Sequence, residues 1–127
     1  MFDILVISEI ESMEFGAGGV RPNIRYAVMY FRFKNEAALK ILIAGNSIRN
    51  IPSSSIIEKG TLIPPDGPIP KSGNEITSVD TLDEAIQVAR QARANPDGFL
   101  ALKNFAPTTQ VFFINRNLVS KPMNIDD

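Results

Sequence analysis

The segment that most constrains the fold is residues 2–10, a predicted strand with apolar residues at both alternating sets of positions. One set holds Phe2, Ile4, Val6 and Ile10, and the other holds Leu5 and Ile7. A strand with one solvent-facing side would instead alternate apolar and polar residues. The segment is therefore predicted to be a central strand of a sheet whose two faces both need cover.

Four further strands are predicted from shorter-range patterns. Residues 24–34 are rich in aromatic and β-branched residues and contain neither glycine nor proline, which is typical of a strand. Residues 39–44, 99–104 and 110–116 carry shorter apolar runs of the same kind. With residues 2–10 they make five predicted strands.

One helix is predicted, at residues 82–94. Apolar residues recur there at helical spacing, and Thr81 and Glu84 match a capping box at its start. The helix should pack on the sheet through Leu82, Ile86 and Ala89.

Residues 45–77 are predicted to form a long proline-rich loop, because the prolines prevent sheet pairing over most of its length. These are Pro52, Pro64, Pro65, Pro68 and Pro70. Residues 118–127 are predicted to be a flexible tail.

The predicted order is therefore β-β-β-loop-α-β-β. Short connections at both ends favour antiparallel neighbours. The expected fold class is α+β, a mainly antiparallel five-stranded sheet with one helix on one face. A length of 127 residues fits a single domain spanning 1–127.

One helix can cover only one face of such a sheet, so the sequence predicts a second cover. A homodimer is the favoured solution, because one patch can meet its own copy across a twofold axis. The predicted interface is Tyr26, Val28, Tyr30 and Arg32, on the face opposite the expected core positions of the same strand. The rival covers are the loop at 45–77 and a ligand.

The chain contains no cysteine and no histidine. Disulfides, the usual zinc ligands and the imidazole base of common hydrolases are therefore excluded. We predict no metal site, no cofactor and no catalytic residue. Glu9, Glu11 and Glu14 could serve an acid–base enzyme or a hard cation, but a solvated strand end is the more ordinary interpretation.

The turn after the first strand is the candidate ligand site. Gly16, Gly18 and Gly19 are followed by Arg21 and Arg25, and glycine-rich backbone with nearby arginine can hold an anion such as a nucleotide. Arg32 or Arg116 could assist. The known phosphate-binding fingerprints require a helix after the glycines, whereas a strand is predicted here, so a simple hairpin turn is the competing interpretation.

By elimination, the sequence favours a non-enzymatic regulatory or accessory protein that binds another macromolecule, most simply a protein. The alternative is a small-ligand binder that sequesters or senses an anion at the glycine turn. Nucleic acid is disfavoured by a pI near 5.4 and only two tyrosines. No apolar run is long enough for a membrane helix, and the expected compartment is the cytoplasm.

Overall fold

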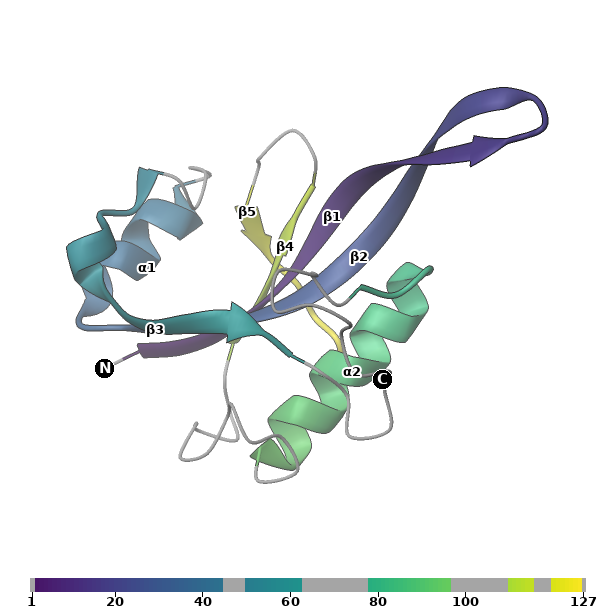
Figure 1. The fold of residues 1–127 in the computed structure, drawn as a ribbon. Helices are drawn as coiled ribbons and strands as arrows, with labels where there is room; N and C mark the ends of the chain where they lie inside the picture. The colour runs from purple at the N-terminus through teal and green to yellow at the C-terminus, as the bar shows by residue number, and fades with distance from the viewer. Residues whose placement is uncertain (1, 45–49, 63–77, 97–109, 116–119, 127) are drawn as a thin grey trace.

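The computed structural model describes residues 2–44, 50–62, 78–96, 110–115 and 120–126. They form an α+β fold in which a mixed sheet lies between two helices (Figure 1). The elements are β1 (Phe2–Gly16), β2 (Gly19–Phe33), α1 (Glu36–Ile43), a short 3-10 helix (Ser53–Ser55), β3 (Ile56–Thr61), α2 (Leu82–Ala94), β4 (Gln110–Ile114) and β5 (Ser120–Pro122). Neither described helix has the length and apolarity needed to cross a membrane.

The sheet has the order β3-β2-β1-β4-β5, so β1 is central as predicted. Three of its pairings are antiparallel, namely β1 with β2, β2 with β3 and β4 with the three-residue β5. The expectation of antiparallel neighbours was wrong for β1 and β4, which run parallel. Parallel neighbours need a crossover connection, and the chain that includes α2 provides one.

Each face of the sheet is covered by its own helix. Leu5 and Ile7 of β1 belong to a buried cluster that includes α2, whereas the alternating Ile4 and Val6 belong to a cluster that includes α1. The prediction of a single helix was therefore wrong. The second cover that the apolar strands demanded comes from within the chain.

Helix α1 occupies most of the segment predicted as the strand 39–44. The Asn35 side chain caps it by accepting a hydrogen bond of 3.0 Å from the Ala37 N–H. Ala38, Leu39 and Leu42 are buried, whereas Ile43 is 56% exposed. The buried positions thus follow helical spacing rather than the alternation of a strand.

Helix α2 matches the predicted bounds of 82–94. The Thr81 hydroxyl accepts from the Glu84 N–H at 3.2 Å, as the capping box predicted. Ala89 is buried, and Leu82 and Ile86 pack against the same cluster.

Two further predictions were wrong in part. Within the predicted loop at 45–77, residues 56–61 form β3; no proline falls inside this stretch, so it can pair with β2. Within the predicted tail at 118–127, Ile125 is buried against the α2 cluster, and the Met123 N–H donates to the Val111 carbonyl at 2.9 Å. The predicted strand at 99–104 lies outside the described residues.

Tyr30 lies across Gly60, its direct partner in the β2–β3 pair. A Cβ added at Gly60 would lie 2.6 Å from the Tyr30 hydroxyl oxygen and 2.7 Å from its ring Cε1. Tyr30 is buried, and burial, with a smaller contribution from the charge of Glu58, raises the pKa of its hydroxyl. The missing side chain at Gly60 therefore leaves the space that the buried Tyr30 ring occupies.

We expect Gly60→Ala to lower the free energy of unfolding by about 1–3 kcal/mol, because the buried ring must shift to admit the methyl group. The matched control is Gly16→Ala, where an added Cβ meets nothing within 4 Å. Urea unfolding measures both. Equal stabilities of the two variants would contradict the packing of Tyr30 on Gly60.

A second comparison tests whether residues 36–43 are helical. Leu42→Ala should lower the free energy of unfolding by about 2–5 kcal/mol because it empties a buried site. Ile43→Ala should change it by under about 0.5 kcal/mol because Ile43 faces solvent. Urea unfolding with a larger loss at Ile43 would instead favour the strand that the sequence predicted.

Candidate functional site

The most distinctive surface feature is a β-hairpin that extends beyond the rest of the sheet (Figure 1). Strands β1 and β2 are each 15 residues long and pair along their whole length. Among the described strands, β4 pairs with β1 only over residues 4–8, and β3 pairs with β2 only over residues 29–33. We call residues 9–25 the arm, since along them the hairpin continues beyond these neighbours.

The tip of the arm is a two-residue turn, Ala17–Gly18, between the paired Gly16 and Gly19. Gly19 has a φ of +104°, which glycine adopts far more readily than other residues. The positive φ falls directly after the two-residue turn, where the chain re-enters the strand pairing. The predicted hairpin turn at the glycines is therefore confirmed.

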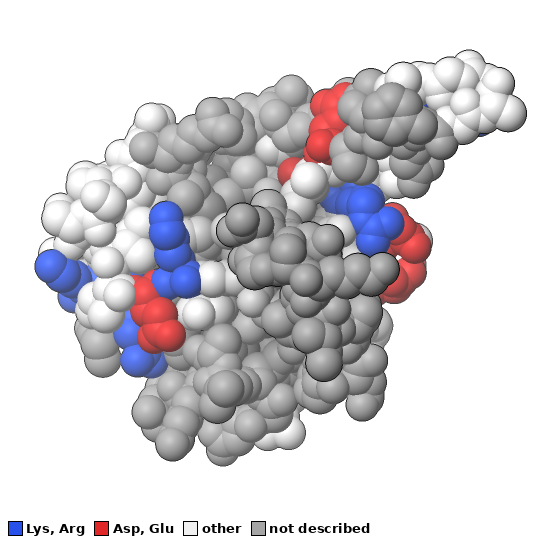
Figure 2. All heavy atoms as spheres, in the orientation of Figure 1, with Lys and Arg blue, Asp and Glu red and all other residues white. Residues whose placement is uncertain are grey.

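One face of the arm carries apolar residue types in cross-strand register. Phe15 is paired with Val20, and Met13 with Pro22. Val20 is 50% exposed, which makes it one of few large apolar side chains in the described part of the chain that are so open. In Figure 2 the described atoms at the far end of the arm are mainly white, and red and blue side chains are seen nearer the body.

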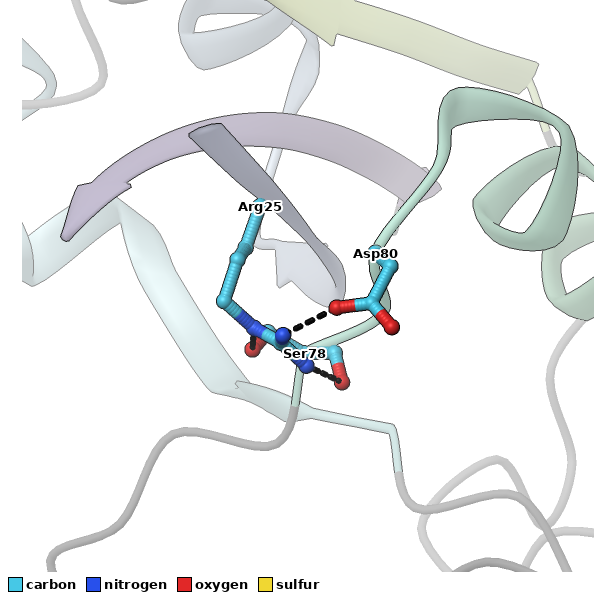
Figure 3. A network of polar contacts seen from close by, with 3 residues as sticks. All are labelled: Arg25, Ser78 and Asp80. Atoms are coloured by element: carbon cyan, nitrogen blue, oxygen red, sulfur yellow. Dashed lines mark hydrogen bonds and ion pairs between the residues drawn. The ribbon is translucent and has the colours of Figure 1, made fainter. Parts of the chain in front are cut away.

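The base of the arm is fastened to the start of α2 (Figure 3). Tyr26 and Val79 exchange two backbone hydrogen bonds, of 2.9 and 2.8 Å. Beside them, the Arg25 guanidinium donates from Nε to the Ser78 hydroxyl at 2.7 Å and from Nη2 to the Ser78 carbonyl at 3.1 Å, and it also pairs with Asp80. We call this group of contacts the Arg25 clasp.

The structure does not bring the predicted anion-binding residues together. Gly16, Gly18, Gly19 and Arg21 lie at the exposed tip, and a Cβ added at Gly18 would lie 3.4 Å from Nη2 of Arg21. Arg25 lies six residues beyond Gly19, about 20 Å along an extended strand. Its guanidinium is already bonded to Ser78 and Asp80.

The two predicted helper arginines are not at the tip either. Arg32 donates to both carboxylate oxygens of Asp3 at 2.8 and 3.0 Å, and this hydrogen bonding raises the pKa of Arg32. Arg116 lies outside the described residues. The anion site is thus reduced to the glycine turn and Arg21.

The predicted dimer interface includes residues that the chain buries itself. Val28 is 4% and Tyr30 is 8% exposed, and both pack in the cluster beneath α2, with Tyr26 at its margin. Arg32 is engaged by Asp3. The argument for a dimer through an uncovered sheet face therefore loses its premise, and the dimer itself stays a prediction.

The predicted carboxylate group also separates along the arm. Glu9, Glu11 and Glu14 are paired in register with Tyr26, Ile24 and Arg21 respectively. Within the described residues, no three acidic side chains come close enough together to hold a metal ion. Glu9 and Glu11 therefore share one parity of β1, whereas Glu14 lies at the other.

The length of the arm is the feature that sequence reasoning missed. The strands were expected at 2–10 and 24–34, whereas pairing continues to Gly16 and from Gly19. The available signal was symmetry: pairing residues outward from the glycine turn matches Phe15 to Val20 and Glu14 to Arg21, which are favourable cross-strand neighbours.

The chain matches no known protein-family model, no curated protein and no solved structure. Its function must therefore be argued from its own geometry.

If the Arg25 clasp holds the arm to α2, Arg25→Ala should speed hydrogen exchange at the Val79 N–H and the Tyr26 N–H. Exchange at the Leu62 N–H, which donates to the Val28 carbonyl at 2.9 Å on the same edge, should change little. The matched control is Arg21→Ala, which removes an exposed arginine from the same strand. Unchanged exchange at Val79 in Arg25→Ala would show that the two backbone bonds suffice without the clasp.

Proposed function

We propose that this protein is a non-enzymatic regulatory or accessory protein that acts by binding another macromolecule through its arm. The observation that carries the proposal is the extension of a paired, partly apolar hairpin beyond both helices. An isolated two-stranded ribbon is only marginally stable in water, so the outer arm adds little to the stability of the body. Projecting elements with exposed apolar residues are typical of interaction sites.

The arm also combines a firm base with an accessible end. The Arg25 clasp and the Tyr26–Val79 bonds fix its root against the α2 segment. Val20 and the glycine turn lie exposed at the other end. A fixed root limits the ordering entropy lost on binding, which favours affinity.

The alternative, a small anionic ligand held at the glycine turn, has weaker support. Gly16, Gly18, Gly19 and Arg21 share the tip, but Arg25 is committed to Ser78 and Asp80. A single exposed arginine on a hairpin tip offers little of the enclosure that small-molecule sites provide.

A photo-crosslinking amino acid placed at Val20 tests the proposal in the cells that make the protein. We expect crosslinked products of discrete higher mass from Val20. The matched control is Ile57, an apolar residue of similar exposure on β3. Products of equal pattern and yield from both positions, or none from Val20, would reject the arm as the binding element.

A further inference from the structure

The described chain after β5 lies against α2. In Figure 1 the yellow segment that follows β5 reaches this helix. We call residues 123–126 the strap. Its side chains alternate, since Met123 and Ile125 pack in the cluster beneath α2, whereas Asn124 and Asp126 are exposed. Ile125 is 1% exposed, so the strap supplies a residue of the core.

Two arginines of α2 bind the strap beside its buried side chain. Nε of Arg90 donates to the Ile125 carbonyl, and Arg93 forms an ion pair with the Asp126 carboxylate. Arg90 and Arg93 are three residues apart in α2, so they lie on the same side of the helix. Two consecutive residues thus offer α2 an aliphatic side chain, a main-chain carbonyl and a carboxylate.

A hydrogen bond within the strap shapes it for this contact. The Asp126 N–H donates to the Asn124 side-chain oxygen at 3.0 Å, which closes a turn of the kind that asparagine forms with its own backbone. Such a turn is a local property of the sequence. A separate peptide with the same residues can therefore adopt it as well.

The strap can leave α2 without separating the other strands. Strand β5 is the last in the described sheet order and has three residues. The Met123 N–H donates to the Val111 carbonyl at 2.9 Å, which extends the β4–β5 pairing by one residue. Segments at the margin of a domain open at a lower free energy than its centre. Opening here uncovers the place of Ile125 while the strands from β3 to β4 stay paired.

We propose that the place of Ile125 and Asp126 on α2 is a peptide-recognition site for a partner protein, and that the strap keeps it closed. The partner segment carries an aliphatic residue followed directly by aspartate or glutamate, the pattern that the site holds in the strap. The inference goes beyond the proposed function, because this site lies on α2 and uses no residue of the arm.

Attachment to the chain gives the strap an advantage over a separate segment. Tethering raises the effective concentration of a segment, to roughly millimolar for a short flexible linker. A partner therefore binds only the fraction of molecules whose strap has left. The Arg93–Asp126 pair adds little affinity, since the Asp126 side chain is 69% exposed. The aliphatic residue supplies most of the affinity, and Arg93 favours an acidic residue after it.

The test uses the full chain and a labelled synthetic peptide with the sequence of residues 120–126. Ile125→Ala weakens the chain's own strap. We expect this variant to bind the peptide about tenfold more tightly than the natural chain, since a strap that is open in about one molecule in ten costs that factor. The control peptide has alanine in place of the isoleucine and should bind neither chain. A folded Ile125→Ala chain that binds the peptide no more tightly than the natural chain would refute the proposal.

Arg93→Ala, made in the Ile125→Ala chain, tests the acidic half of the pattern. It should weaken binding of the peptide about two- to fivefold, as expected for a largely exposed ion pair. The matched control is Arg21→Ala in the same chain, which removes an exposed arginine from the arm and should leave the affinity unchanged. Equal affinities of the two variants would contradict recognition of the carboxylate.

Two measurements on the natural chain decide the matter if Ile125→Ala unfolds. The Met123 N–H should exchange faster than the N–H of Ala89, which is buried within α2, and excess peptide should speed that exchange further. Equal protection of the two groups would mean that the strap opens only when the body unfolds, which overturns the proposal. A doubled mass in solution that excess peptide reverses would assign the site to the strap of a second copy and reject the partner protein.

Discussion

The burial of β1 on both faces is the constraint on which the rest of the structure depends. Its residues from Ile4 to Ile7 are at most 1% exposed, so apolar side chains leave the same short stretch in both directions. At roughly 25 cal/mol per Å² of apolar surface, leaving either face in water would forfeit several kcal/mol. Two helices, α1 and α2, satisfy the two faces separately.

The arm belongs to the same two strands, β1 and β2, but in the arm the strands are no longer buried on both faces. Nearer the body, helices and neighbouring strands surround β1 and β2. Farther out, β1 and β2 pair with each other as far as the turn, and the Arg25 clasp holds the hairpin at its root. One continuous hairpin thus serves as core at one end and as a presented surface at the other.

The central strand and α2 could be predicted because their signals are local and strong. Apolar residues at both parities mark β1, and the Thr81–Glu84 capping box marks α2. Helix α1 was misread because Leu39, Ile41 and Ile43 also alternate as a strand would. Its Asn35 cap was the local signal that could have separated the two interpretations. The parallel pairing of β4 and the assignment of Tyr30 to the α2 face depend on long-range topology, which residue patterns do not specify.

The candidate site was predicted only at its glycine turn, because the strands were predicted to end before most of the arm.

Pro22 has a consequence for the protein at high concentration. The arm carries acids along β1 and arginines along β2. The β1 side of one molecule therefore matches the β2 side of another in charge. Such head-to-tail contacts do not close on themselves and would grow into filaments. Even-numbered residues of β2 turn their backbone groups away from β1, as the bonds between Tyr26 and Val79 show. Pro22 therefore removes one N–H donor from this outer edge, which makes the edge a poor template for a further strand. Pro22 therefore makes the outer β2 edge of the arm less able to accept a strand from a second molecule.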